Sequence, residues 1–373
     1  MIRVTNIISD TNIGGAGHVI VNYLKHTDKN NFETSIILPC GSKLIPKLKP
    51  FGVKITEIDG IADKSLDLKA INELKKAIRE INPDIVHAHG SMSGRIAGKQ
   101  CRKKVVFTRH SVFPVSPKIK SGPGHLINKI INEHYCDRAI AVSPAAKENL
   151  TDGGMKDSMI DIIMNGVDPV LPISDEKIKQ KRNEMGISEN TLICSIPARI
   201  EHYKGHKTIV EAAKILKDRN KDFVILIAGT GSYVKEVEEM IEKADISDKV
   251  KMLGFVSDIP TLLSITDLQI NASYATEATS LSLLEGMSIG LPTVASDYGG
   301  NPYIVREGEN GYIFPQKNAA AMADAIERII DNREKAKEMG LCAKVIYEKE
   351  FTGQIFAGNI EKVYYDLMKG KKK

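Results

Sequence analysis

Residues 2–18 read IRVTNIISDTNIGGAGH. The first seven are mostly apolar, as in a buried strand, and a glycine-rich turn leads from them into a segment of helical periodicity. This order of strand, glycine turn and helix is typical of the start of a doubly wound α/β domain. Glycines let the backbone approach a ligand closely, and the first turn of a helix offers free amides to an anion. The turn around Gly14 and Gly15 is therefore a candidate phosphate-binding loop.

The same alternation of short apolar runs and helical segments continues through the whole chain. Strands are predicted in the first half at Ile2–Ile8, Thr34–Leu38, Val53–Ile58, Ile85–Ala88, Val105–Thr108, Ala139–Val142 and Ile160–Met164. Strands are predicted in the second half at Leu192–Pro197, Phe223–Ala228, Val250–Leu253, Leu268–Asn271 and Thr293–Ala295. Apolar runs separated by helices predict parallel sheets with helices on both faces, which is the α/β class.

The length of 373 residues, with 42% hydrophobic content, suffices for two cores. A Gly-then-Pro hinge at Asn165–Pro169 and the charged stretch Asp175–Glu184 separate the two series of strands. We place the boundary at residue 168, which gives an N-terminal domain of residues 1–168 and a C-terminal domain of residues 169–373. The final helix could also return to pack on the first domain. Two such domains predict a central cleft at the carboxyl ends of their strands.

The charge is unevenly distributed. The formal net charge is +5, but residues 1–170 carry 24 Lys/Arg against 17 Asp/Glu, whereas the remainder carries 28 against 30. Residues 85–132 contain nine Lys/Arg and no acidic residue. This stretch is either a solvated basic face or a surface for anionic lipid headgroups or a phosphate-bearing acceptor. Nucleic acid is disfavoured, because no Arg-rich helix interleaved with aromatics occurs there.

Cysteines and hydropathy indicate the compartment. The five cysteines are scattered, with no C-x-x-C pair, so we expect buried thiols and neither disulfides nor a zinc site. No apolar run approaches the roughly 18–20 residues that span a bilayer, and the amino terminus has no signal-peptide pattern. We expect a cytoplasmic protein, either free or peripheral on the inner face of the cell membrane.

Two cations follow the first strand of the second half. Residues 197–205 read PARIEHYKG, with Arg199 and Lys204 ahead of the helix that Gly205 introduces. A guanidinium fork and a compact ammonium together suit a pyrophosphate, although a surface ion pair is the alternative.

Two glutamates lie further on, in residues 271–287, which read NASYATEATSLSLLEGM. Glu277 and Glu285 are eight residues apart, a spacing that does not favour a general acid/base pair. We expect Glu277 in a loop and Glu285 in a helix, each reaching a different hydroxyl-bearing part of one long ligand. The helix amino terminus at Ser280 and Leu281 could hold a phosphate between them.

Nicotinamide and metal chemistry are disfavoured. The G-x-G-x-x-G fingerprint fails both at Gly15 and at Gly229. No Asp-x-Asp triplet occurs, and His87 and His89 have no evident third ligand, so we interpret these two as structural histidines.

Seven motifs follow one another in a characteristic order. They are the amino-terminal Gly-Gly turn, Arg199-x4-Lys204-Gly205, Gly229-Thr230-Gly231, Leu253–Val256, Glu277-x7-Glu285, Gly290-Leu291-Pro292 and Gly299-Gly300. Over essentially the whole chain this set resembles the retaining glycosyltransferases of family 4. The resemblance implies the GT-B fold of two facing Rossmann-like domains.

The resemblance also implies residue roles. It places Arg199 and Lys204 on the donor diphosphate, Glu285 on the ribose, Glu277 on the donor sugar and His110 near the sugar's anomeric centre. Further donor contacts are implied for Gly14, Gly15, Gly229, Phe255, Val256, Thr279, Ser280 and Leu281. The acceptor would enter through the first domain.

The implied activity is retaining, metal-independent hexosyl transfer without a cofactor. A hexose or N-acetylhexosamine would pass from a nucleotide sugar, expected to be UDP-linked, to a cell-surface glycan, a glycolipid or a phosphate-bearing acceptor. Relatives often have Gly-Phe or Gly-Leu where this chain has Ala278-Thr279, and glutamate where it has Tyr303. These departures leave the donor sugar open. Alternatives are a nucleotide-sugar 2-epimerase, whose additional carboxylates we do not find, and a non-catalytic binding subunit.

Overall fold

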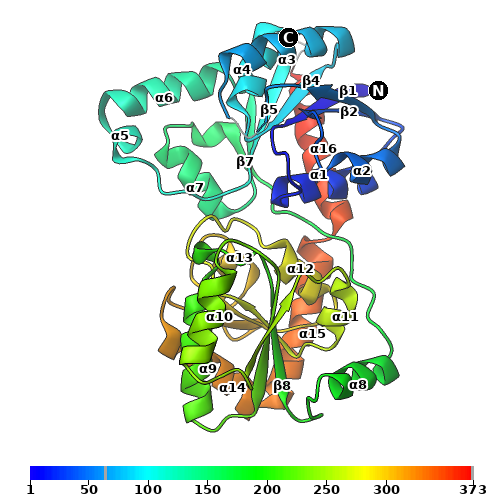
Figure 1. The fold of residues 1–373 in the computed structure, drawn as a ribbon. Coiled ribbons are helices and arrows are strands. Elements are labelled where there is room, and N and C mark those ends of the chain that lie inside the picture. Colours follow the sequence, from blue (N-terminus) through cyan, green and yellow to red (C-terminus); the bar gives the residue numbers. More distant parts are fainter. Residues whose placement is uncertain (63–64, 371–373) are drawn as a thin grey trace. The chain divides into compact units, whose positions relative to one another are not determined.

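The computed structural model describes residues 1–62 and 65–370 and divides the chain into two compact units (Figure 1). The first unit comprises Met1–Gly166 and the residues from Gly353 onward, and the second comprises Val167–Thr352. Each contains one parallel sheet with helices around it. The division falls two residues before the expected position 168. The final helix belongs to the first unit, in agreement with its expected return to the first domain.

The first unit is built on a seven-stranded sheet in the order β3-β2-β1-β4-β5-β6-β7. Its strands are β1 (Ile2–Ile8), β2 (Phe32–Pro39), β3 (Lys54–Ile58), β4 (Ile85–His89), β5 (Lys104–Arg109), β6 (Arg138–Ala141) and β7 (Ile160–Ile162). Its helices are α1 (Gly15–His26), α2 (Ile45–Leu48), α3 (Leu68–Ile81), α4 (Met92–Gln100), α5 (Pro117–Lys120), α6 (Gly122–His134), α7 (Pro144–Asp152) and α16 (Gly353–Lys369). Because β1, β4 and β5 are parallel neighbours, the residues that follow them meet at one edge of the sheet.

Helix α16 is held in the first unit by a buried aromatic contact. Tyr364 has no exposed surface and meets Tyr23 of α1 edge to face, with ring centroids 6.2 Å apart. Its hydroxyl lies 2.7 Å from His87 Nδ1 on β4. Burying a large side chain of this kind contributes roughly 1.5–3 kcal/mol. The carboxyl-terminal helix therefore forms part of the core of the first unit.

The second unit is built on a six-stranded parallel sheet in the order β10-β9-β8-β11-β12-β13. Its strands are β8 (Leu192–Pro197), β9 (Phe223–Ala228), β10 (Val250–Gly254), β11 (Leu268–Asn271), β12 (Thr293–Ser296) and β13 (Gly311–Phe314). Its helices are α8 (Asp175–Glu184), α9 (His206–Asp218), α10 (Val234–Lys243), α11 (Ile259–Ser264), α12 (Leu281–Ser288), α13 (Asn301–Ile304), α14 (Ala319–Asp331) and α15 (Arg333–Glu350). Strand β13 is absent from the prediction, because four residues beginning with glycine give too short a pattern.

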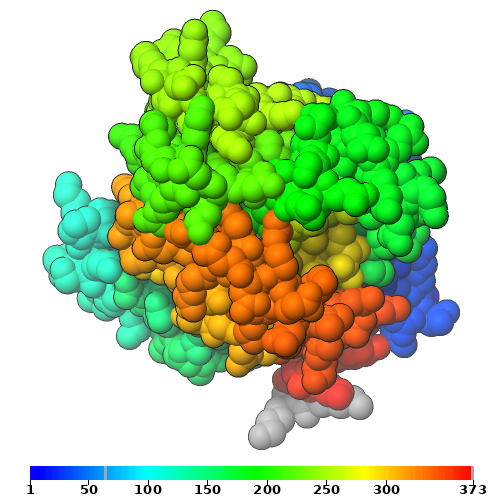
Figure 2. Space-filling view, turned by 90° about the horizontal axis from the view of Figure 1, so that it is seen from below, coloured from blue at the N-terminus to red at the C-terminus, as the bar shows by residue number. Residues whose placement is uncertain are grey.

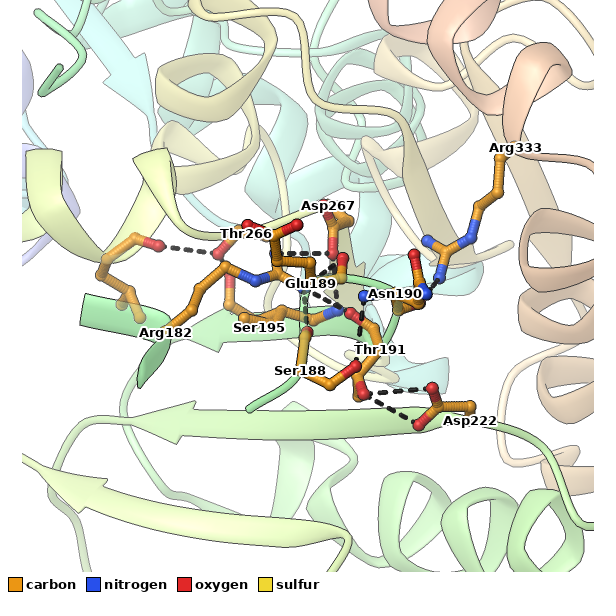
Figure 3. A network of polar contacts seen from close by, with 12 residues as sticks. Arg182, Ser188, Glu189, Asn190, Thr191, Ser195, Asp222, Thr266, Asp267 and Arg333 are labelled. Atoms are coloured by element: carbon orange, nitrogen blue, oxygen red, sulfur yellow. Dashed lines mark hydrogen bonds and ion pairs between the residues drawn. The ribbon is translucent and has the colours of Figure 1, made fainter. Parts of the chain in front are cut away.

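The charged stretch Asp175–Glu184 forms helix α8, which one buried arginine ties to the sheet (Figure 3). Arg182 is only 8% exposed. It donates to the Ser188 carbonyl oxygen at 3.1 Å and to the Thr191 carbonyl oxygen at 2.5 Å, and lies 3.3 Å from Asp267 Oδ2. The polar segment after the hinge is therefore a docked helix.

Helices α9 and α14 are joined at their surface by ion pairs. Arg219 lies 2.7 Å from Asp324, and Lys221 lies 2.8 Å from Asp331. Figure 2 looks onto this face, where the orange surface of α14 and α15 adjoins green residues from the first half of the unit. These charges are solvated and contribute little to stability individually.

Two expectations from hydropathy and cysteines are tested by the fold. No helix within the described residues is long and apolar enough to cross a membrane. All five cysteines are free, but only Cys136 and Cys194 are buried, whereas Cys40 and Cys342 are exposed and Cys101 is intermediate. The expectation of five buried thiols was wrong for these three: Cys40 follows β2, Cys101 caps α4, and Cys342 lies on α15.

Candidate active site

The centre of the second unit's site is a buried ion pair at the carboxyl ends of β8 and β11. Lys204 Nζ lies 2.7 Å from Glu277 Oε2, with side-chain exposures of 19% and 8%. The same carboxylate oxygen accepts hydrogen bonds from Asn271 Nδ2 at 3.3 Å and from Ser273 Oγ at 3.0 Å. Asn271 ends β11 and Ser273 follows it, so this strand supplies two of the three donors.

These donors keep Glu277 ionised although it is buried. Burial is the largest influence on this carboxyl and acts to raise its pKa. The charge of Lys204 and the hydrogen bonds from Lys204, Asn271 and Ser273 outweigh burial, so the pKa of Glu277 lies below its ordinary value. The site therefore holds a buried carboxylate whose Oε2 has three donors.

Backbone geometry positions the Glu277 loop. Thr276 adopts φ +62°, which is unusual for a β-branched residue and stores strain beside a functional side chain. A Cβ atom on Gly299 would overlap the Glu277 carbonyl oxygen, and one on Gly300 would overlap the Ala278 carbonyl oxygen. The Gly299-Gly300 pair therefore lets the chain after β12 lie directly against the Glu277 loop.

The two predicted cations, Arg199 and Lys204, both follow β8 but differ in their surroundings. Lys204 ends the short 3₁₀ helix η3 (His202–Lys204), and Gly205 follows it at φ +76°. A Cβ atom at Gly205 would overlap the Ala272 carbonyl oxygen, so glycine is required where this turn meets β11. Arg199 is exposed and donates to the Tyr203 hydroxyl at 2.8 Å.

Glu277 lies in the loop and Glu285 in α12, as expected from their spacing. Ser280 caps α12 without a side-chain hydrogen bond to the helix backbone, and its first turn carries no acidic residue. Ser280 Oγ instead lies 3.2 Å from Ser282 Oγ. The amides from Leu281 onward, next to Thr279, can therefore donate to an anionic ligand.

Two further loops of the second unit adjoin each other. The Gly229 amide donates to the Gly254 carbonyl oxygen at 2.7 Å, which joins the loops after β9 and β10. Gly229 adopts φ +156°, and a Cβ atom there would overlap the Ala198 carbonyl oxygen. Beyond Gly254, Phe255 is 78% exposed and Val256 is half-buried. An exposed aromatic ring at a strand end can stack on a flat ligand group.

The first unit supplies an uncapped helix terminus. Gly14 is the N-cap of α1, with no side-chain cap and no acidic residue in the first turn. The first amides of α1 therefore have no side-chain cap at the Gly14–Gly15 turn.

Three histidine rings follow one another at the ends of β4 and β5. His87 and His89 stack with centroids 4.3 Å apart, and His89 and His110 stack with centroids 5.1 Å apart. Burial lowers the pKa of His87 to about 3 and that of His110 to about 4. Burial and the two neighbouring rings keep the pKa of His89 far below its ordinary value. All three imidazoles are therefore neutral at physiological pH.

The site contains partners that the sequence analysis missed. Asn271 and Ser273 were inside a quoted motif but had no assigned role, and their alternate spacing at a strand end was the available signal. His89 was interpreted as structural, yet it contacts His110. Strand pairing brings them together, because His89 is the register partner of Thr108. Among the described residues, no group of three His, Cys, Asp or Glu side chains could hold a metal ion.

Comparison with known proteins identifies the family. Residues 177–344 match the family described as Glycosyl transferases group 1, and residues 13–171 match the one described as Glycosyltransferase Family 4. The chain belongs to the family 4 glycosyltransferases. The two matches cover most of both units, and the resemblance noted in the motifs is confirmed.

Individual relatives of this glycosyltransferase extend over most of its length. It is 24% identical to an N-acetyl-alpha-D-glucosaminyl L-malate synthase of Bacillus anthracis, over 96% of each chain. It is 27% identical to the UDP-Gal:alpha-D-GlcNAc-diphosphoundecaprenol alpha-1,3-galactosyltransferase of Escherichia coli, over 82% of this chain and 81% of the relative. The structure of Anabaena Alr3699/HepE in complex with UDP and glucose has a TM-score of 0.84 at 20% identity, covering 98% of this chain and 100% of that one. The expected GT-B fold, with two Rossmann-like domains, is confirmed.

Proposed function

We propose that this glycosyltransferase moves a hexose or N-acetylhexosamine from a UDP-linked sugar, with retention and without a metal or cofactor. The observation that carries the proposal is the buried Lys204–Glu277 pair beside the uncapped terminus of α12. An ammonium, a carboxylate and a row of amides fit a diphosphate joined to a sugar. The Escherichia coli relative is named for UDP-Gal and the Anabaena structure is a complex with UDP and glucose, which supports UDP as the nucleotide.

The cations would act on the leaving group. As the bond from the anomeric carbon to the phosphate oxygen breaks, negative charge grows on the diphosphate. Lys204 and Arg199 would stabilise that charge, together with the amides at the start of α12. The guanidinium of Arg199 is exposed and donates to the Tyr203 hydroxyl, so it can turn toward a diphosphate.

Glu277 would position the sugar and would not form a covalent bond with it. Its Oε2 is occupied by three donors and its pKa is lowered, both of which weaken it as a nucleophile. Its Oε1 would accept a hydrogen bond from a sugar hydroxyl. The acceptor hydroxyl would then attack from the leaving-group face, forming the new C–O bond while its proton passes to the departing diphosphate. Trapping of a glycosyl adduct on Glu277 would contradict this route.

The remaining donor contacts follow from the same placement. Glu285 of α12 would accept from the ribose hydroxyls. Phe255 and Val256, beside Gly229, would meet the base, since the phenyl ring is largely exposed at a strand end. Gly14 and Gly15 would offer amides to phosphate and sugar.

The decisive experiment offers the purified protein a panel of UDP-, GDP- and ADP-sugars. Binding raises the apparent stability of the folded state, so a thermal-shift screen identifies the donor before any acceptor is known. We expect stabilisation by a UDP-sugar and slow release of UDP. Interconversion of C2 epimers would favour the epimerase, and binding without any turnover would favour a binding subunit. Absence of binding to every nucleotide sugar would refute the proposal.

For the acceptor side, we propose a lipid-linked or phosphate-bearing glycan reached from an anionic membrane surface. Three large apolar side chains share one face of α6, namely Leu126, Ile127 and Ile130, with exposures of 58%, 58% and 59%. Residues 85–132 around them contain nine Lys/Arg and no acidic residue. An exposed apolar stripe within a basic region is the pattern of an interfacial helix. The Escherichia coli relative is named for a diphosphoundecaprenol-linked substrate, which supports this acceptor class.

Sedimentation with vesicles tests the surface. Replacing Leu126, Ile127 and Ile130 by Gln should abolish binding to phosphatidylglycerol-containing vesicles and leave UDP-sugar hydrolysis unchanged. The matched control replaces Leu341 and Val345 of α15, which are 68% and 46% exposed, and should bind vesicles normally. Equal vesicle binding by both variants would show that residues 85–132 form only a solvated basic face.

A further inference from the structure

A chain of hydrogen bonds in the first unit has an unsatisfied buried atom at each end, Asn6 Nδ2 and His110 Nδ1. Asn6 Oδ1, on the central strand β1, lies 2.9 Å from His89 Nε2. His89 Nδ1 in turn lies 2.8 Å from His110 Nε2. The Nδ1 atom of His110 is buried and has no hydrogen-bond partner among the described residues.

The chemistry of these groups gives the chain a direction. An amide oxygen only accepts, so His89 must donate to Asn6 from Nε2. A neutral imidazole carries one proton, which leaves His89 Nδ1 as an acceptor and requires His110 to donate from its own Nε2. The one remaining ring nitrogen, His110 Nδ1, is then a bare lone pair. The orientation of the Asn6 amide thus determines, two hydrogen bonds away, what His110 can bind.

We propose that His89 is a positioning residue that holds His110 as the Nε2–H tautomer, so that Nδ1 accepts a hydrogen bond from a substrate hydroxyl. A buried polar atom without a partner calls for an unseen water or ligand. The ligand group must be a donor, because a carboxylate or phosphate oxygen would meet the lone pair repulsively. This inference rests on the proposed glycosyl transfer for the identity of the hydroxyl, which belongs to a sugar substrate.

The neighbouring ring, His87, makes separate hydrogen bonds, and its partner Thr108 provides a control. His87 lies 2.6 Å from Thr108 Oγ1 and 2.7 Å from the Tyr364 hydroxyl, so both of its nitrogens have partners. Hydroxyls can either donate or accept, and these contacts therefore impose no tautomer on His87. Substituting Thr108 by Val perturbs the stack without touching the His89–His110 hydrogen bond.

Nitrogen NMR of the protein labelled with ¹⁵N-histidine tests the tautomer without any substrate. His110 Nδ1 should show the shift of an unprotonated, pyridine-type nitrogen and Nε2 that of a protonated one, both in the wild type and in Thr108→Val. A proton on His110 Nδ1, or on His89 Nδ1, would overturn the assignment. Because no donor sugar is present, this outcome is independent of whether the protein turns over nucleotide sugars.

Kinetics with UDP-glucose as the probe separates positioning from folding. His89→Leu removes the acceptor for His110 Nε2 and should lower kcat/KM for UDP release by about tenfold or more, with the affinity for UDP alone unchanged. His89→Gln offers an amide oxygen in its place and should recover part of the loss. Full activity in His89→Leu would refute the positioning role. Failure of the wild type to hydrolyse any nucleotide sugar would refute the proposed function and leave the tautomer result standing.

Discussion

Replacing Lys204 by Met should separate the structural from the chemical use of the buried ion pair. The substitution keeps an apolar stem but leaves Glu277, whose side chain is 8% exposed, without its cation. Removing one partner of a buried pair costs about 3–5 kcal/mol, because the remaining charge stays desolvated. The loss of a transition-state charge contact should also lower kcat by roughly 10²–10³.

The double variant Lys204→Met/Glu277→Gln distinguishes the two effects. Gln removes the stranded charge and can still accept from Asn271 and Ser273, so most of the lost stability should return. Activity should not return, because the diphosphate still lacks its ammonium. The surface pair Lys181–Glu184 has the same 2.7 Å separation but is 47% and 45% exposed, so Lys181→Met should leave the stability nearly unchanged.

The stability loss in Lys204→Met should also depend on pH. In the wild type the pKa of Glu277 lies below its ordinary value of 4.5, so its contribution to stability is present above that pH and is lost as the pH falls. Without Lys204, only the hydrogen bonds from Asn271 and Ser273 act against the effect of burial, so the pKa of Glu277 rises. The difference in unfolding free energy should therefore shrink between pH 7 and pH 4. Urea denaturation at several pH values measures it, and a pH-independent difference, or a double variant no more stable than the single one, would refute the reasoning.

Three other changes are predicted. Gly300→Ala should lower the free energy of unfolding by about 1–3 kcal/mol, because its Cβ overlaps the Ala278 carbonyl oxygen in the Glu277 loop. Displacement of that loop should also lower the rate of donor turnover; an unchanged rate would contradict this. Arg182→Met should cost about 3 kcal/mol through the carbonyl oxygens it leaves unpaired, with hydrogen exchange rising first in α8. Because the pKa values of His87 and His110 are lowered to about 3 and about 4, stability should fall as pH drops below about 6.5, by up to 1.4 kcal/mol per pH unit for each ring; a urea midpoint constant from pH 7 to pH 5 would contradict this.

The α/β fold could be predicted from the sequence because the apolar runs of both sheets are short, regular and separated by helical segments. Strand β13 escaped notice since its four residues begin with a glycine and follow an asparagine. Helix α8 escaped because its buried residue is an arginine, which gives no hydropathy signal, and its single apolar residue, Ile178, is only partly buried against the core. The return of α16 to the first unit depends on the aromatic contact of Tyr364 with Tyr23, which a linear pattern does not reveal.

The residues of the candidate site could be predicted where they lie within one sequence motif. Lys204 and Glu277 were identified from motif spacing, but their contact needs β8 and β11 to be neighbours in the sheet. The contact of His89 with His110 needs β4 and β5 to pair in register. Such contacts join residues that are remote in sequence, and only the strand order brings them together.

The two units use ionisable groups in opposite ways, and the proposed reaction explains why. In the second unit, Lys204 keeps Glu277 charged despite burial, and a fixed cation is what a departing diphosphate requires. In the first unit, burial lowers the pKa of His110 to about 4, so its ring is uncharged at physiological pH. A neutral lone pair can still orient a hydroxyl. Strong charge therefore lies where the leaving group is expected, and a weak, directional acceptor where a substrate hydroxyl must be held without being ionised.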